Sequence, residues 1–167
     1  MLRHLLVILS SLAVLNSNEV TVQMGADDNE SDAVRAQKQE IIEATKKLLT
    51  AIGGGDFEAY KKMRHPDLTS FESESIGVLV KNMEFHRYFI ENVLPPGVLH
   101  TLIVNPHVHM LGKDAAYIAY IRLTQSVGQD FKGKTDRAEE TRIWQRNNGT
   151  WLNVHFHRTG STSLHTK

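Results

Sequence analysis

The stretch Trp151-Leu-Asn-Val-His-Phe-His-Arg-Thr-Gly160, near the end of this 167-residue chain, decides the fold. Its composition predicts a β-strand, in which side chains point to opposite faces in turn. One predicted face carries Leu152, Val154, Phe156 and then Arg158, and the other carries Trp151, Asn153, His155 and His157. A guanidinium on the apolar face needs a carboxylate partner or a ligand, because an unpaired buried charge is costly. The strand therefore predicts a pocket inside a curved sheet.

Three more runs rich in β-branched and aromatic residues precede this strand. Together with it they predict a strand meander over 98–109, 115–125, 135–146 and 150–158. The segment Asn147-Asn-Gly149 is typical of a tight hairpin turn between the last two strands.

The first half of the chain carries helical patterns instead. Apolar residues recur at helical spacing from Ser31, a good N-cap, to Gly53-Gly-Gly55, and this predicts one long helix. Asp56 is placed to cap a short helix over 57–63, and a third helix is predicted around 75–94. Helices followed by a strand meander indicate a single α+β domain.

Composition limits the classes of function. Lys plus Arg and Asp plus Glu both total 19, so the formal charge is zero and nothing indicates binding to nucleic acid. There is no cysteine, which excludes disulfides, thiol catalysis and zinc sites built on thiolates. No cofactor-binding motif is recognised, and we predict no cofactor.

The N-terminus has more than one interpretation. The run from Leu5 to Leu15 is apolar except for two serines, which matches a signal-peptide core and is short for a membrane-spanning helix. A signal-like leader, a membrane anchor and a segment unrelated to the fold all remain open. The predicted organisation is a hydrophobic leader, a disordered acidic linker, a folded domain and a tail, over 1–23, 24–32, 33–161 and 162–167.

Seven segments, in order and without large gaps, resemble the association (hub) domain of calcium/calmodulin-dependent protein kinase II. They are Lys38-Gln-Glu-Ile-Ile42, Gly55-Asp-Phe-Glu-Ala-Tyr60, Phe85-His-Arg87, Asn105-Pro-His-Val-His109, Ala119-Tyr-Ile-Arg-Leu-Thr-Gln125, Glu139-Glu-Thr-Arg142 and Trp151 to Gly160. The resemblance implies a cone-shaped fold of the nuclear transport factor 2-like superfamily, with a long N-terminal helix packed in a strongly curved antiparallel sheet. It also implies stacked-ring homo-oligomers, dodecamers or tetradecamers, that organise the kinase holoenzyme in the cytoplasm.

Kinase motifs are missing from this sequence: there is no Gly-rich phosphate loop, no His-Arg-Asp loop and no Asp-Phe-Gly. A hub behind an apolar leader resembles the layout of the non-kinase anchoring variant of the family. That layout implies co-assembly with hubs of the full-length kinase, and anchoring to a membrane through residues 1–23.

The resemblance also implies an internal cleft that accepts small carboxylates or linker segments of the kinase. The residues that match its lining and mouth are Arg122, Arg142, Arg158, His86 and Tyr60. Guanidinium groups bind carboxylates strongly where water is scarce, which fits such a role. The alternative is that these arginines pair with internal acids such as Glu140 and are purely structural.

Two further hypotheses compete with a binding domain. The pairs His107/His109 and His155/His157 each face one way on a strand and could offer metal ligands, but solvent-facing or interface histidines are favoured and no metal site is predicted. The same superfamily includes lyases and isomerases, which would use His86 and Tyr60. We favour a non-enzymatic role, because no obvious carboxylate base lies on the apolar face.

Overall fold

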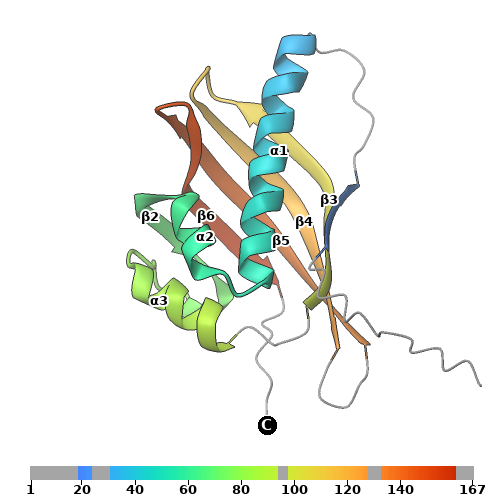
Figure 1. The fold of residues 1–167 in the computed structure, drawn as a ribbon, viewed down its shortest axis with the longest axis vertical. Coiled ribbons are helices and arrows are strands. Elements are labelled where there is room, and N and C mark those ends of the chain that lie inside the picture. Colours follow the sequence, from blue (N-terminus) through green and yellow to red (C-terminus); the bar gives the residue numbers. More distant parts are fainter. Residues whose placement is uncertain (1–18, 24–30, 94–97, 128–132, 161–167) are drawn as a thin grey trace, which may run out of the picture.

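The computed structural model describes residues 19–23, 31–93, 98–127 and 133–160. One long helix, α1, lies across one face of a six-stranded sheet, and the short helices gather at one end of it (Figure 1). The helical elements are α1 (Asp32–Gly53), α2 (Phe57–Lys62), η1 (Ser73–Ser75), α3 (Met83–Tyr88) and η2 (Phe89–Val93). The strands are β1 (Glu19–Gln23), β2 (Arg64–Phe71), β3 (Val98–Met110), β4 (Ala115–Val127), β5 (Gly133–Asn147) and β6 (Thr150–Gly160).

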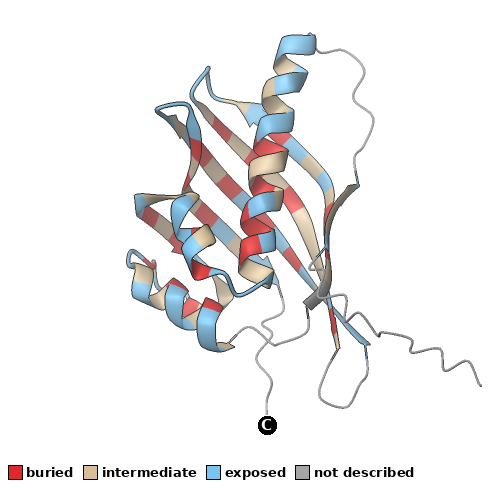
Figure 2. Cartoon of the chain, viewed as in Figure 1, coloured by how far each residue is buried: buried red, intermediate tan, exposed pale blue. Residues whose placement is uncertain are grey.

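Helix α1 begins and ends where the sequence predicts. The Ser31 side chain accepts a hydrogen bond from the Val34 backbone N–H, and the helix closes at Gly54 before Gly55 adopts a positive φ of 69°. Its apolar stripe packs into the main core and includes Ile41, Ile42, Leu48 and Leu49. Figure 2 shows buried positions on the helix and on the strands behind it.

The predicted third helix is wrong in its first half. Helix α3 starts only at Met83, where Asn82 caps it by accepting a hydrogen bond from Phe85 N at 3.1 Å. Upstream, Ile76 and Gly77 have φ values of 51° and 79°, and two consecutive left-handed residues cannot continue a right-handed helix. The helical path then runs on through η2 to Val93.

The sheet has the order β1-β3-β4-β5-β6-β2, and its four central strands form the predicted antiparallel meander. Asn148 and Gly149 form the predicted hairpin turn, with φ values of 49° and 79°. Both edge strands pair in parallel, β1 with β3 and β2 with β6, so the sheet is mixed rather than purely antiparallel. The α+β class is confirmed.

Strand β1 lies within the segment that the sequence assigned to the leader. Residues 19–23 belong to the sheet, where Val20 and Val22 pack against the core and Thr21 Oγ1 lies 3.0 Å from His100 Nε2. The rest of the leader and most of the linker lie outside the described residues, so the predictions made for them stay predictions. Within the described ranges, no helix is long and apolar enough to cross a membrane.

A bulge in β6 makes the predicted inward and outward faces of this strand wrong in its first half. Asn153 pairs with Trp144, but the next pair along is His155 with Ile143, so Val154 is an extra residue and the alternation reverses there. The interior therefore receives Trp151, Asn153 and Phe156, while Leu152 and Val154 are only partly buried. The prediction that Phe156 and Arg158 share a face holds, because both lie beyond the bulge.

Candidate functional site

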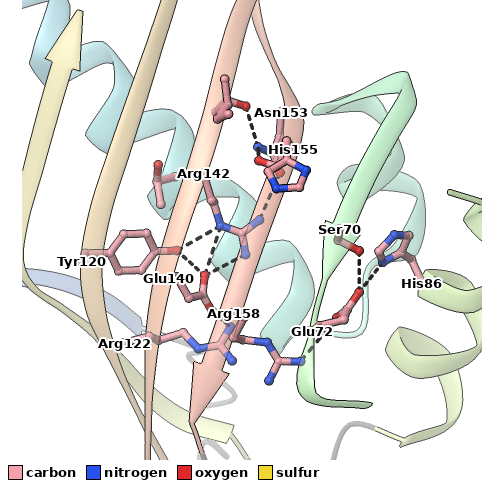
Figure 3. Close-up of polar contacts among 12 residues, drawn as sticks. Ser70, Glu72, His86, Tyr120, Arg122, Glu140, Arg142, Asn153, His155 and Arg158 are labelled. Carbon is pink, nitrogen blue, oxygen red and sulfur yellow. Dashed lines mark hydrogen bonds and ion pairs between the residues drawn. The ribbon is translucent and has the colours of Figure 1, made fainter. Parts of the chain in front are cut away.

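Glu140 is the centre of a polar cluster inside the sheet. It lies on β5 opposite Tyr120 of β4, whose hydroxyl donates a hydrogen bond of 2.5 Å to Oε2 (Figure 3). The same Oε2 accepts hydrogen bonds from Arg142 Nη2 at 2.9 Å and Nε at 3.2 Å. Oε1 lies 2.9 Å from Arg122 Nη1 as an ion pair without hydrogen-bond geometry. The single carboxylate is therefore shared by two guanidinium groups.

Arg142 is fully engaged by its neighbours. Besides Glu140, its guanidinium donates to Tyr120 Oη at 3.0 Å and to Asn153 Oδ1 at 3.1 Å. Its Cζ lies 4.5 Å from the centroid of the Phe156 ring, on the neighbouring strand. The alternative that the sequence left open for Arg142, a pairing with Glu140, is thus present in the structure.

Arg158 lies further along β6 and is held by two other carboxylates. Its Nη2 is 3.3 Å from Glu72 Oε2 and also forms a short ion pair with Glu74. Glu72 follows β2 directly and accepts a hydrogen bond of 2.9 Å from Ser70, whereas Glu74 belongs to η1. Burial raises the pKa of Glu72, and the opposing effects of Arg158 and Ser70 are smaller.

His86 and Tyr60 pack beside this second group. The ring of His86, on α3, lies 5.8 Å from that of Tyr60, and its Nδ1 is 3.4 Å from Glu72 Oε1. Burial, and then the charges of Arg64 and Arg142, lower the pKa of His86 to about 4, so the imidazole is neutral at pH 7. Burial also raises the pKa of Tyr60, which keeps its hydroxyl protonated.

Two buried polar atoms here have no hydrogen-bond partner among the described residues: the Tyr60 hydroxyl and Nε2 of His86. With Nδ1–H directed at Glu72, Nε2 could accept a proton or a hydrogen bond from a ligand, and the Tyr60 hydroxyl could donate one. A lyase or isomerase would need such a pair, but a binding site can use it equally well.

The structure brings all five predicted residues to the same side of the sheet. Glu140 pairs across the strands with Arg158, which joins the two halves of the cluster. The sequence did not single out four of their partners: Glu72, Glu74, Tyr120 and Asn153. A hollow of about 380 Å³ lies at this end of β6, and Arg158 and Glu72 are among the residues that line it.

The histidine pairs do not converge. His107 and His109 both flank Tyr117, with ring centroids 6.1 and 5.4 Å away. His155 and His157 flank Phe71, towards the opposite edge of the sheet. Strands β4 and β5 lie between the two pairs. In the described part of the chain, no three His, Cys, Asp or Glu side chains are grouped to hold a metal ion.

This fold is that of the nuclear transport factor 2-like superfamily. A superfamily member from Salmonella enterica superposes with a TM-score of 0.62 at 18% identity, over 80% of this chain and 96% of that one. The association domain of the Caenorhabditis elegans kinase, called CaMKII, superposes with a TM-score of 0.73 at 40% identity, over 77% of this chain and 99% of that one.

The sequence comparisons identify the family to which the chain belongs within this fold. The sequence model of the calcium/calmodulin dependent protein kinase II association domain matches residues 37–162, and the chain belongs to that family. It is 49% identical over 154 residues to the delta subunit of the type II kinase from Oryctolagus cuniculus, a match that covers 91% of this chain. Only 29% of that subunit's length is covered, so the similarity is to an association domain and not to the whole kinase.

Proposed function

We propose that this chain is an assembly module that forms stacked-ring homo-oligomers, dodecamers or tetradecamers, and that it organises kinase holoenzymes by co-assembling with hubs of full-length subunits. Membership of the association-domain family carries this proposal. The balanced charge of the chain supports it too, because it offers little electrostatic resistance to self-association. Cytoplasmic location and anchoring through the leader stay predictions.

The turn after η1 offers a contact surface for a second copy. Ile76 and Val78 are 88% and 65% exposed there, and neighbouring exposed aliphatic side chains are typical of interaction sites. Ile76 has a φ of 51°, which is unfavourable for a β-branched residue. Burial of its side chain against another subunit would offset that strain.

We expect light scattering to give the native chain the mass of a ring assembly, and Ile76→Asn to shift it to smaller species. Asparagine tolerates a left-handed backbone, so this variant should fold normally. Leu111→Asn is the matched control, because Leu111 is 54% exposed in the β3–β4 turn, away from Ile76, and its variant should keep the native mass. A monomeric native chain would overturn the assembly proposal, and an Ile76→Asn variant of native mass would place the contact elsewhere.

We further propose that the arginine cluster binds a small carboxylate or a linker peptide of the kinase. Arg158 is the arginine best placed for this, since it lines the hollow while Arg142 is enclosed by protein. Its guanidinium can offer two parallel N–H donors to a carboxylate.

Removal of this guanidinium is therefore expected to weaken binding strongly. Isothermal titration with propionate should show at least tenfold weaker binding for Arg158→Ala, because a hydrogen bond to a charged group contributes about 1.5–3 kcal/mol. Arg137→Ala, which removes an exposed arginine of β5, should bind as the native chain does. Unchanged affinity in a folded Arg158→Ala variant would disprove the assignment.

A further inference from the structure

The arginine cluster already contains as many carboxylates as arginines. Arg122 and Arg142 share Glu140, and Arg158 is held by Glu72 and Glu74. A carboxylate ligand would thus bring a fourth negative charge into a site with three positive ones. That is unfavourable where water is scarce, unless a resident carboxylate leaves the cluster as the ligand enters.

Two of the three carboxylates are fixed. Glu140 is 2% exposed and is bound by Tyr120, Arg122 and Arg142 together. Glu72 accepts a hydrogen bond from Ser70 and contacts His86 as well as Arg158. Displacing either of them would leave several buried polar groups without partners, which is expensive.

Glu74 is held differently. Among the described residues its side chain makes an ion pair with Arg158 and no other hydrogen bond or ion pair. It belongs to a single 3-10 turn, a form of helix with poor hydrogen-bond geometry, and the exposed Ile76 and Val78 follow it directly. The repulsion between Glu74 and the neighbouring Glu72 opposes its present position.

We propose that Glu74 is a resident carboxylate that occupies Arg158 and is displaced when a small monocarboxylate binds. This inference rests on the proposed carboxylate binding and adds that Glu74 controls the affinity by competing for Arg158. One carboxylate replaces another, so the charge of the cluster is conserved when the ligand is a monoanion. A dianion such as succinate leaves a surplus negative charge and binds more weakly than propionate.

The displacement also links the site to the surface of the domain. Glu74 can leave Arg158 by a change of side-chain rotamer or by a movement of η1, which is held by Ser73 Oγ to Gly160 O at 3.3 Å and by Ser75 Oγ to Glu72 O at 2.7 Å. Ile76 and Val78 follow η1, so a movement of η1 on ligand binding would shift the turn that we propose as a contact between copies.

The test is isothermal titration of propionate and succinate into the full chain and into Glu74→Gln. Glutamine keeps the shape of the side chain but removes the competing charge, so propionate should bind about tenfold more tightly, a typical size for coupling between two binding events. Glu84→Gln, which changes an exposed glutamate on α3, should leave the affinity unchanged. Circular dichroism establishes that each variant is folded.

The outcomes separate the inference from the proposed function. If both chains bind propionate with equal affinity, or prefer succinate, Glu74 is not the displaced group, although the carboxylate site stands. If neither the native chain nor Glu74→Gln binds propionate, the carboxylate site itself is refuted. Binding by Glu74→Gln alone would support both, with the native site blocked by its own side chain.

Discussion

Glu140→Leu is expected to lower the free energy of unfolding by about 3–5 kcal/mol, the usual cost of leaving a buried charge without its partner. The substitution removes the only carboxylate that contacts Arg142 in the described structure, and Arg142 is buried. Arginine cannot escape by losing its proton, since its pKa is far above the physiological range. Urea denaturation at one fixed protein concentration measures the change, because assembly also contributes to stability.

Two comparisons give this result its meaning. Glu139→Leu changes the adjacent exposed residue on the same strand and should stay within about 0.5 kcal/mol of the native chain. Combining Glu140→Leu with Arg142→Leu should recover part of the loss, because replacing a buried ion pair by apolar residues is often neutral, whereas Arg122 stays without its carboxylate. If Glu140→Leu costs under about 1 kcal/mol, the cluster is not the charge-balanced unit that we describe.

The ion pair between Glu140 and Arg142 also predicts that the free energy of unfolding depends on pH. Burial alone would raise the pKa of Glu140, but Arg122, Arg142 and Arg158, with the Tyr120 hydroxyl, together lower it to about 2. Since the folded pKa lies below the unfolded value of about 4.3, this stabilisation is complete above that value and is lost as the pH falls towards 2. Glu140→Gln should flatten the stability curve over this window.

Glu72 acts in the opposite direction. Because its pKa is raised, protonation of Glu72 favours the folded state as the pH falls. The stability of the native chain against pH therefore combines a gain from Glu72 with a loss from Glu140. The difference between the native chain and Glu140→Gln isolates the contribution of Glu140. A constant difference between pH 2 and 5 would contradict the lowered pKa.

Local signals made the helix α1, the hairpin and the four central strands predictable. The Ser31 cap, the glycines after α1 and the Asn-Gly turn each act on backbone only a few residues away. The pairing of Arg142 with Glu140 was also open to prediction, because two residues of one strand at a spacing of two share a face.

The remaining parts depend on contacts that are distant in the sequence. Strand β1 pairs Glu19 with His100, and β2 pairs Thr69 with His155, so neither edge strand has a nearby partner to reveal it. Arg158 reaches Glu74 across 84 positions, in a 3-10 turn just before the segment that the sequence pattern assigned to the third helix. The bulge at Val154 is equally hidden, because strand alternation carries no information about an extra residue.

That bulge explains why the second large effect is expected at Asn153, which is 0% exposed. Its Nδ2 donates hydrogen bonds to the backbone carbonyls of Ile143 at 2.8 Å and His155 at 2.9 Å, and its Oδ1 accepts one from Arg142 at 3.1 Å. The side chain thus satisfies carbonyl groups on either side of the disrupted ladder. It also fixes the orientation of Arg142 towards Glu140.

Asn153→Ala should therefore destabilise the domain by about 2–4 kcal/mol, since each buried polar group left without a partner costs about 1–3 kcal/mol. Asn147→Ala, at an exposed position before the hairpin turn, is the matched control for urea denaturation. Asn153→Asp distinguishes the two roles, because an ionised carboxylate can accept from Arg142 but cannot donate to the carbonyls. We expect Asn153→Asp to be as unstable as Asn153→Ala. Full rescue by aspartate would instead make Arg142 the important partner and the bulge carbonyls incidental.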